Sequence, residues 1–322
     1  MSAHSEHARQ PRCFGLPPCT WSPQDLDHEP WTGDEPADEP MGTKEKEWVR
    51  DADAHPWLFK RARSPEGAVR GEDWAECLVH ALAGLIGVPS ACVCPARRGD
   101  ARGILSRSFL TEGEQLEHGN ELLAAEDPTY DKENARNPGY TVTAVHGVLS
   151  DVSPSIGTPS SMTGFEAWAG YLMLDAWVSG CDRHHENWAV IRTPSTSRLA
   201  PSFDHGNALG FQEPEHRLST LVSPDSVGKW ARRGVNRYFG GESKSPVALA
   251  AEAFGLCNPR AKEYWLCRLR DASEDHVKEI LQAPPDEILS EPRRSFIEKL
   301  LRTNRRRILD AIGPCTGRTD PD

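Results

Sequence analysis

The sequence predicts an α+β protein of two lobes, a small β-rich N-terminal lobe with one helix and a larger, mainly helical C-terminal lobe. Short strand-like segments surround one amphipathic helix in the first third of the chain, after a polar start. Helical periodicity dominates the last third. The length of 322 residues suits one bilobed chain or two modest domains.

Four segments are expected along the chain. Residues 1–41 are rich in Pro, Asp, Glu and His with little hydrophobic periodicity, so we expect a disordered acidic tail. Trp21 and Trp31 could instead pack on the folded body. The small lobe is assigned to residues 42–115 and the large lobe to residues 116–312. Residues 313–322 are polar, with Gly and Pro, and are expected to form a second tail.

The small lobe is expected to follow the order strand, strand, helix, strand, strand. A helix is predicted over residues 71–86, because Trp74, Leu78 and Leu82 recur at helical spacing. Gly87-Val88-Pro89 would end it. The segments with strand character are residues 42–51, 55–62, 91–94 and 102–110.

The large lobe is expected to contain one β-hairpin among helices. A strongly apolar helix over residues 164–179 would deliver the chain to Asp182. Residues 188–192 and 199–203 are typical of two strands that flank a turn. The remaining helices are predicted at residues 142–149, 246–255, 260–282 and 293–312.

Composition argues against several classes of protein. The net charge of −11 makes direct nucleic-acid binding unexpected, because such binding relies on basic surface. The chain has no apolar run long enough for a membrane span and no apolar N-terminal segment typical of a secretory signal. The nine cysteines include no Cys-X-X-Cys pair, so reduced thiols in a cytoplasmic protein are expected.

The most informative stretch is DRHHEN, which begins at Asp182 and ends at Asn187, followed by Asp204 in SFDHG. Transfer of a phosphoryl group from ATP needs an acid that takes or orients the hydroxyl proton, and oxygen ligands for magnesium. Asp182 is the candidate for the first role, and Asn187 and Asp204 are candidates to bind Mg²⁺. His184 could orient Asp182 or contact the γ-phosphate, or it could be a structural hydrogen-bonding residue.

A second group of residues would bind the nucleotide. Lys60 ends a strand of the small lobe, from which its ammonium could reach the α- and β-phosphates of ATP. Glu76, on the following helix, is the favoured partner of this Lys, with Glu72 and Asp73 as rivals. The turn that begins Gly42-Thr43 could cover the phosphates with backbone N–H groups, or it could be the end of a linker.

These motifs resemble the HipA-like kinase family (the HipA C-terminal-like domain), which belongs with the phosphatidylinositol 3- and 4-kinases among the atypical kinases. The resemblance covers residues 42–312 and rests on WLFK, the helix after it, RGILSRSFL, HGNELL, DRHHEN and FDHG. It implies a bilobed protein-kinase-like fold and serine/threonine protein kinase activity. It also implies that Lys60 binds ATP, that Asp182 is catalytic, and that Asn187 and Asp204 bind magnesium.

The chain departs from the family pattern in two places. Ser179-Gly180-Cys181 precedes Asp182 where family members often have Gly-Asn-Thr, which changes the approach to the loop but no ligand. Some members are toxins of toxin–antitoxin pairs and carry an extra N-terminal subdomain, for which residues 1–41 are too short and too polar. An antitoxin-type partner is compatible with the resemblance, but the sequence does not identify one.

The leading hypothesis is therefore an ATP- and Mg²⁺-dependent phosphotransferase that acts on a protein substrate. A phosphoinositide or small-alcohol kinase would use the same groups. A metal-dependent hydrolase could use His184, His185, Asp204 and His205 as ligands but would leave Lys60 without a role. A nucleotide-binding pseudokinase is the alternative without catalysis.

Overall fold

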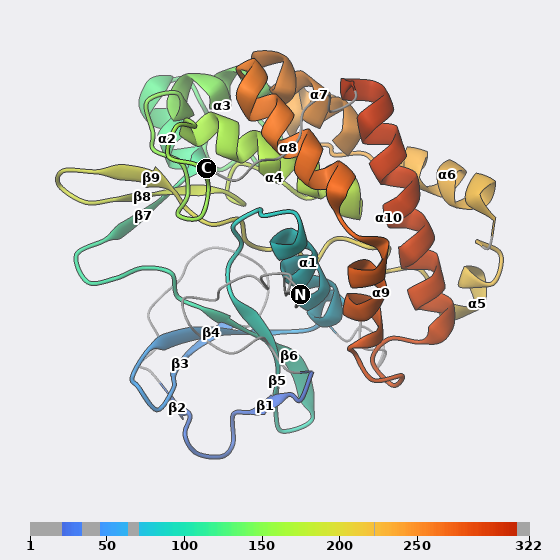
Figure 1. Cartoon of the computed structure of the whole chain (residues 1–322). Helices are drawn as coiled ribbons and strands as arrows, with labels where there is room; N and C mark the ends of the chain where they lie inside the picture. The colour runs from blue at the N-terminus through green and yellow to red at the C-terminus, as the bar shows by residue number, and fades with distance from the viewer. Residues whose placement is uncertain (1–20, 34–45, 64–70, 222, 314–322) are drawn as a thin grey trace, which may run out of the picture.

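The computed structural model describes residues 21–33, 46–63, 71–221 and 223–313. It confirms the predicted α+β architecture of two lobes. Figure 1 shows a curved sheet with helix α1 (Glu72–Leu85) beside it, and a larger body of helices that lies beyond α1 on the same side of the sheet. A small second sheet lies beside the helical body.

The small lobe is built on a six-stranded sheet in the order β1-β5-β6-β4-β3-β2. Its neighbouring strands are antiparallel, except that β1 and β5 are parallel. Helix α1 (Glu72–Leu85) follows β4 in the chain and packs against β5 and β6. The four predicted strands and the predicted helix are all present. The strands are β1 (Gln24–Asp25), β2 (Thr32–Gly33), β3 (Lys46–Arg50), β4 (Pro56–Arg61), β5 (Val93–Arg98) and β6 (Ala101–Arg107).

The expectation of a disordered tail over residues 1–41 is wrong for residues 21–33, which supply the two edge strands β1 and β2. Leu26 is only 4% exposed, and the Trp31 ring meets the Trp57 ring edge-on at 5.9 Å. Trp21 packs against the core of the protein. Leu26 and Trp31 pack against apolar side chains of the sheet, which explains why a segment of polar composition folds there.

The large lobe begins with a strand and a helix that the sequence analysis did not predict. Strand β7 (Gln115–His118) pairs with β8 (Ala189–Arg192), and β8 pairs with β9 (Ser197–Leu199) in the predicted hairpin. Helix α2 (Gly119–Glu126) follows β7 directly. Because β7 belongs to this second sheet, it connects the segment after the small lobe to the hairpin that lies between the DRHHEN and SFDHG motifs.

The central helix of the large lobe is α4 (Gly164–Val178), in which every residue is buried. Thr163 and Glu166 form a capping box at its start, and it ends at Ser179 in the left-handed conformation. Helix α3 (Val142–Leu149) has the predicted bounds. Since α4 has no solvent face, the position of its last turn is fixed by packing from all sides.

The C-terminal helices surround α4. The prediction of a single helix over residues 260–282 is wrong. The first helix ends at Ala272, and Ser273 caps a second helix by accepting the N–H of His276. Helices α5 and α6 were not predicted. The elements are α5 (Glu215–Leu218), α6 (Pro224–Arg233), the 3₁₀ turn η2 (Phe239–Gly241), α7 (Pro246–Leu256), α8 (Pro259–Asp271), α9 (Glu274–Gln282) and α10 (Glu291–Ile312).

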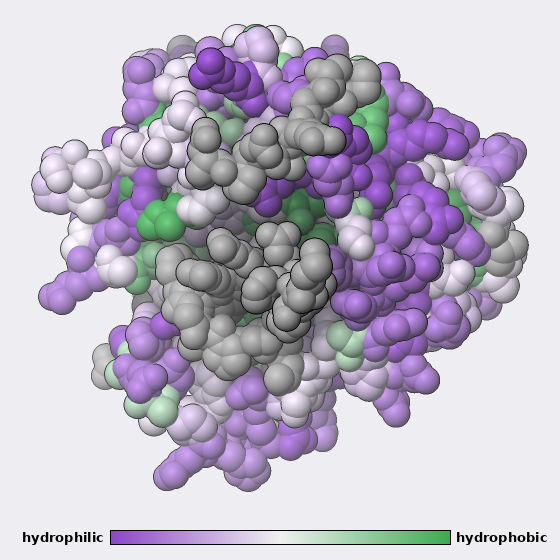
Figure 2. All heavy atoms as spheres, viewed as in Figure 1, coloured by the Kyte–Doolittle hydropathy of each residue, from purple (hydrophilic) through white to green (hydrophobic). Residues whose placement is uncertain are grey.

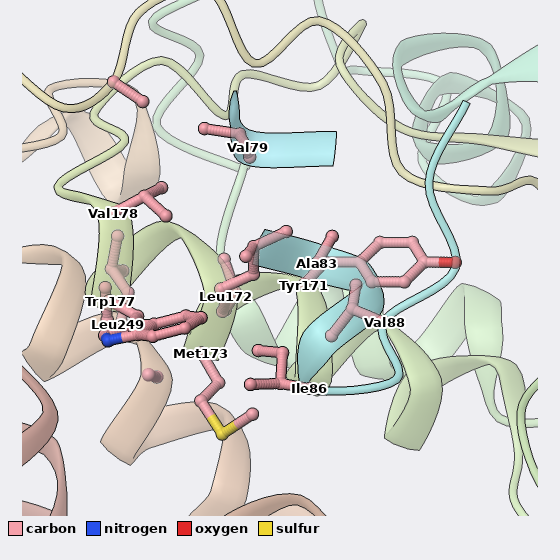
Figure 3. Close-up of a cluster of buried hydrophobic side chains, with 14 of the residues drawn as sticks. Val79, Ala83, Ile86, Val88, Tyr171, Leu172, Met173, Trp177, Val178 and Leu249 are labelled. Carbon is pink, nitrogen blue, oxygen red and sulfur yellow. The ribbon is translucent and has the colours of Figure 1, made fainter. Parts of the chain in front are cut away.

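One buried cluster joins the two lobes. Figure 3 shows side chains of α1 and α4 gathered in the same apolar region. The labelled residues are Val79, Ala83, Ile86, Val88, Tyr171, Leu172, Met173, Trp177, Val178 and Leu249. This packing holds the helix of the small lobe against the central helix of the large lobe, and so fixes the distance between the residues that each lobe contributes to the site.

Two further expectations concern surface and cysteines. None of the described helices is long and apolar enough to cross a bilayer, and the face in Figure 2 is dominated by hydrophilic residues. Cys77, Cys94, Cys181 and Cys257 carry thiols that form no disulfide bond, as expected for these positions.

Candidate active site

One cavity brings together the three residues predicted to carry the chemistry. Asp182, Asn187 and Asp204 line it together, between the loop after α4 and the segment after β9. Two loops that are adjacent because of the β8–β9 hairpin supply these side chains, as the spacing of the motifs predicted. Carboxylate and amide oxygens from two loops therefore converge on one small space.

Asp182 is held at both its backbone and its side chain. Its carbonyl oxygen accepts hydrogen bonds from Asn187 Nδ2 at 2.6 Å and from the N–H of His184 at 2.8 Å. Its Oδ1 accepts a hydrogen bond from the hydroxyl of Tyr238 at 2.8 Å. The loop therefore presents the carboxylate in a defined direction.

Asp204 has a backbone φ of 59°, in the left-handed region that few residues other than Gly adopt. Asp and Asn tolerate this region better than other L-residues. Its Oδ1 lies 3.7 Å from Nζ of Lys60. The strained turn thus points the second acid at the small lobe.

Lys60 and Glu76 form the strand–helix pair that the sequence predicted. Lys60 Nζ lies 3.9 Å from Glu76 Oε1, and the two side chains are 12% and 5% exposed. The rival acids pair elsewhere: Glu72 lies 3.6 Å from Arg63, and Asp73 lies 2.7 Å from Arg102. Glu76 is therefore the acid on α1 that faces Lys60.

Gly42 and Thr43, predicted to lie over the phosphates, are outside the described residues. Their place in the site stays a prediction.

The three histidines near the motifs have different environments. His184 does not line the cavity: its Nδ1 accepts the N–H of Glu186 at 3.3 Å, and its ring lies 5.2 Å from that of Tyr238. His185 is buried and bonded to the Tyr130 hydroxyl, and burial lowers its pKa to about 4. His205 lines the cavity, and burial lowers its pKa well below the usual value.

The ligand set of a metal-dependent hydrolase does not assemble. In the parts of the chain that the structure describes, Asp51, Asp53 and His55 form the one group of three or more such side chains with ligand atoms within 4.8 Å of one another. This group lies in the β3–β4 turn, where Asp51 already accepts hydrogen bonds from the backbone and from Trp57. His184, His185, Asp204 and His205 form no such group.

Arg183, whose partner the sequence left open, pairs with an acid of the core. It donates to both carboxylate oxygens of Asp175 on α4, to the Asn187 carbonyl at 2.8 Å and to the Ser202 hydroxyl at 3.0 Å. Burial raises the pKa of Asp175, and the Arg183 guanidinium opposes that shift. Arg183 thus connects the central helix to both loops of the site.

Sequence reasoning missed Asp175 and Tyr238. Asp175 had a detectable signal, because a single acid in the last turns of an otherwise apolar helix needs a buried partner. No sequence signal indicated the contact of Tyr238 with Asp182, since Tyr238 lies in a loop 56 positions further along the chain.

The cavity suits a hard divalent cation. Magnesium prefers oxygen ligands, and Asp204 and Asn187 offer a carboxylate and an amide oxygen. Asn187 uses its Nδ2 on the carbonyl of Asp182, so its Oδ1 is the atom available to a cation. The Lys60 ammonium adds positive charge on the side of the small lobe, as a site for phosphates would require.

No family model matches the chain, and no curated protein matches it. Among solved structures it is similar to the proinflammatory kinase CtkA of Helicobacter pylori, with a TM-score of 0.67 and 13% identity over 87% of this chain and 95% of that chain. This chain has the fold of the HipA-type kinases. Its similarity to HipA of Shewanella oneidensis MR-1, solved with HipB and operator DNA, has a TM-score of 0.51 and 14% identity, over 88% of this chain and 67% of HipA. The resemblance predicted from the motifs is confirmed at the level of the fold.

Proposed function

We propose that this chain is an ATP- and Mg²⁺-dependent phosphotransferase whose acceptor is a serine or threonine hydroxyl of a protein. One observation carries the proposal: Asp182, Asn187 and Asp204 line one cavity, and Lys60, paired with Glu76, lies 3.7 Å from Asp204. These are the groups that phosphoryl transfer requires. The HipA-type kinase fold supports a kinase-type phosphotransferase in general.

Each residue of the site has a separate role in the proposed reaction. Lys60 would contact the α- and β-phosphates, and Glu76 would hold the Lys60 ammonium in place. Asn187 and Asp204 would hold Mg²⁺, which when bound neutralises charge on the phosphates. Asp182 would orient the acceptor hydroxyl toward the γ-phosphate and receive its proton.

The competing functions fit less well. The hydrolase alternative lacks a converging ligand set among the described residues. A phosphoinositide kinase would need a basic membrane-facing loop after Asp204, and there Lys229 of α6 is already paired with Asp225 at 2.9 Å. The pseudokinase alternative is disfavoured because Asp182, Asn187 and Asp204 all line the cavity and Lys60 lies 3.7 Å from Asp204.

The nucleotide site is tested by titrating ATP into the protein in a calorimeter, with and without magnesium. Asp204→Asn is the informative variant, because Asn tolerates the left-handed backbone at this position while removing the charge. We expect magnesium-dependent binding in the wild type and a loss of at least about tenfold in the variant. Asp225→Asn, an exposed acid on α6, is the matched control. Absence of binding in the wild type would refute the proposal.

The Asp182→Ala variant tests whether Asp182 acts in phosphoryl transfer and not in nucleotide binding. We expect this variant to bind MgATP like the wild type and to lose phosphoryl transfer by at least ~10²-fold. Transfer would be followed with radiolabelled ATP, by autophosphorylation and with casein and myelin basic protein as acceptors. Transfer at the wild-type rate would exclude Asp182 as the catalytic acid.

A further inference from the structure

We infer that Tyr238 is a positioning residue for Asp182: its hydroxyl holds one carboxylate oxygen, so that the other faces the acceptor hydroxyl. This inference rests on the proposed function, because it assigns Asp182 to the acceptor. It adds a residue that lies outside both sequence motifs.

The hydrogen bond between Tyr238 and Asp182 is charge-assisted, because its acceptor is a carboxylate. The Tyr238 hydroxyl donates to Oδ1 of Asp182 at 2.8 Å. Burial and the nearby Asp182 carboxylate raise the pKa of Tyr238 to about 12, so the phenol keeps its proton at neutral pH. The hydroxyl is therefore a hydrogen-bond donor to Asp182 throughout the working range of pH.

The backbone on either side of Tyr238 is tied down. Asn236, which is 2% exposed, exchanges two backbone hydrogen bonds with Lys244, at 2.8 and 3.0 Å. Its side chain accepts the N–H of Tyr238 at 2.9 Å and donates to the carbonyl of Arg183 at 3.4 Å. On the other side Phe239 is fully buried and stacks on Tyr140 with ring centroids 4.2 Å apart. Tyr238 is thus a rigid part of the site.

The aromatic ring has a separate contact. It lies 5.2 Å from the ring of His184, which belongs to the same loop as Asp182. His184 therefore meets Tyr238 by packing, while Asn187 holds the carbonyl of Asp182. With the backbone fixed by Asn187 and one carboxylate oxygen fixed by Tyr238, loss of the phenol hydroxyl would free the carboxylate to rotate.

Tyr238→Phe isolates the hydroxyl, because Phe keeps the ring that packs on His184. Transfer from radiolabelled ATP to casein, to myelin basic protein and to water would be measured beside MgATP binding. We expect kcat to fall about 10- to 100-fold while the KM for ATP stays within about twofold. Tyr264→Phe on α8, outside the cavity lining, is the matched control. A wild-type kcat in Tyr238→Phe would overturn the inference.

A double-mutant cycle distinguishes positioning from a general structural effect. In the Asp182→Ala background, which removes the acceptor oxygen, Tyr238→Phe should cause no further loss of the residual rate, because the hydroxyl acts only through the carboxylate. Additive losses would overturn the inference, as would phosphate on Tyr238 after incubation with MgATP, which would make it an acceptor. A wild type that neither binds MgATP nor transfers phosphate would instead remove the proposed function on which the inference depends.

Discussion

The ammonium of Lys60 lies 3.7 Å from Oδ1 of Asp204, although one residue ends a strand of the small lobe and the other follows the hairpin of the large lobe. The Lys60 side chain is only 12% exposed and also lies 3.9 Å from Glu76. The Lys60 ammonium is therefore shared between two acids at the junction of the lobes. In the proposed function, this is the group that would contact the phosphates of the nucleotide.

Replacing Lys60 tests this junction. Lys60→Met keeps the length and apolar character of the side chain but removes its charge, so we expect ATP to bind more weakly and transfer to fall by ~10²-fold or more. Calorimetry and radiolabelled ATP measure the two effects. Lys278→Met, on an exposed part of α9, is the control for the substitution itself. Equal activity in both variants would exclude contact between Lys60 and the nucleotide.

The Arg183–Asp175 pair makes a prediction about stability. Arg183 is 4% exposed and Asp175 is 6% exposed, so Arg183→Met would leave a carboxylate buried beside the site. Breaking such a pair costs about 3–5 kcal/mol in the free energy of unfolding. Urea denaturation measures this cost. Arg302→Met, whose side chain is 58% exposed and paired with Glu274 and Glu298, should cost less than ~1 kcal/mol.

The double variant separates charge burial from packing. If the cost in Arg183→Met comes from the unpaired carboxylate, adding Asp175→Leu should restore part of the lost stability. A double variant less stable than either single one would show that the contacts of Arg183 with Asn187 and Ser202 matter more than its charge partner.

The sequence predicted the site better than its surroundings, for a physical reason. The short spacings within DRHHEN and across one hairpin leave few ways to place Asp182, Asn187 and Asp204, so their convergence followed from local structure. Lys60 and Glu76 were predictable because they lie on adjacent elements whose periodicity is clear. Each of these contacts needs only a strand, a helix or a tight turn to form.

Contacts between distant segments were not predictable in this way. Tyr238 reaches Asp182 through a loop whose sequence has no periodic pattern, and β1 and β2 have two residues each, too few for alternation to appear. The break between α8 and α9 was missed because apolar spacing continues across it, although Ser273 is a capping residue. Tertiary packing decided the first two features, and a local cap decided the third.

The lowered pKa of Glu114 makes the free energy of unfolding depend on pH. A hydrogen bond from Arg198, at 2.6 Å, holds the pKa of Glu114 at about 2, below its usual 4.5. A carboxyl with a depressed pKa in the folded state stabilises the protein above the unfolded value, and this contribution is lost as pH falls from 4.5 toward about 2. The ion pair also joins the segment before β7 to β9, because Arg198 belongs to β9. Within its own segment, Glu114 accepts a hydrogen bond from the N–H of Thr111.

Glu114→Gln should therefore lower the free energy of unfolding at neutral pH by ~1 kcal/mol, after solvent screening of the pair is considered. The difference from the wild type should shrink at about pH 3, because Glu114 is then protonated in the unfolded chain while it is still ionised in the folded protein. Urea denaturation at both pH values measures it. Glu112→Gln, at a neighbouring exposed position, is the control. A difference that stays constant with pH would contradict the assignment of this contact.

Two glycines in helices predict effects of opposite sign. A Cβ on Gly119, the first residue of α2, would lie 2.2 Å from the Trp188 ring and 2.5 Å from the carbonyl of His185. Gly119→Ala should destabilise the protein by about 1–3 kcal/mol and disturb the loop that carries Asn187. A Cβ on Gly147, in α3, would meet nothing within 4 Å, so Gly147→Ala should stabilise by about 0.5–1 kcal/mol. Thermal unfolding of both variants measures the contrast, and destabilisation of equal size would show that the approach of α2 to Trp188 does not limit this position.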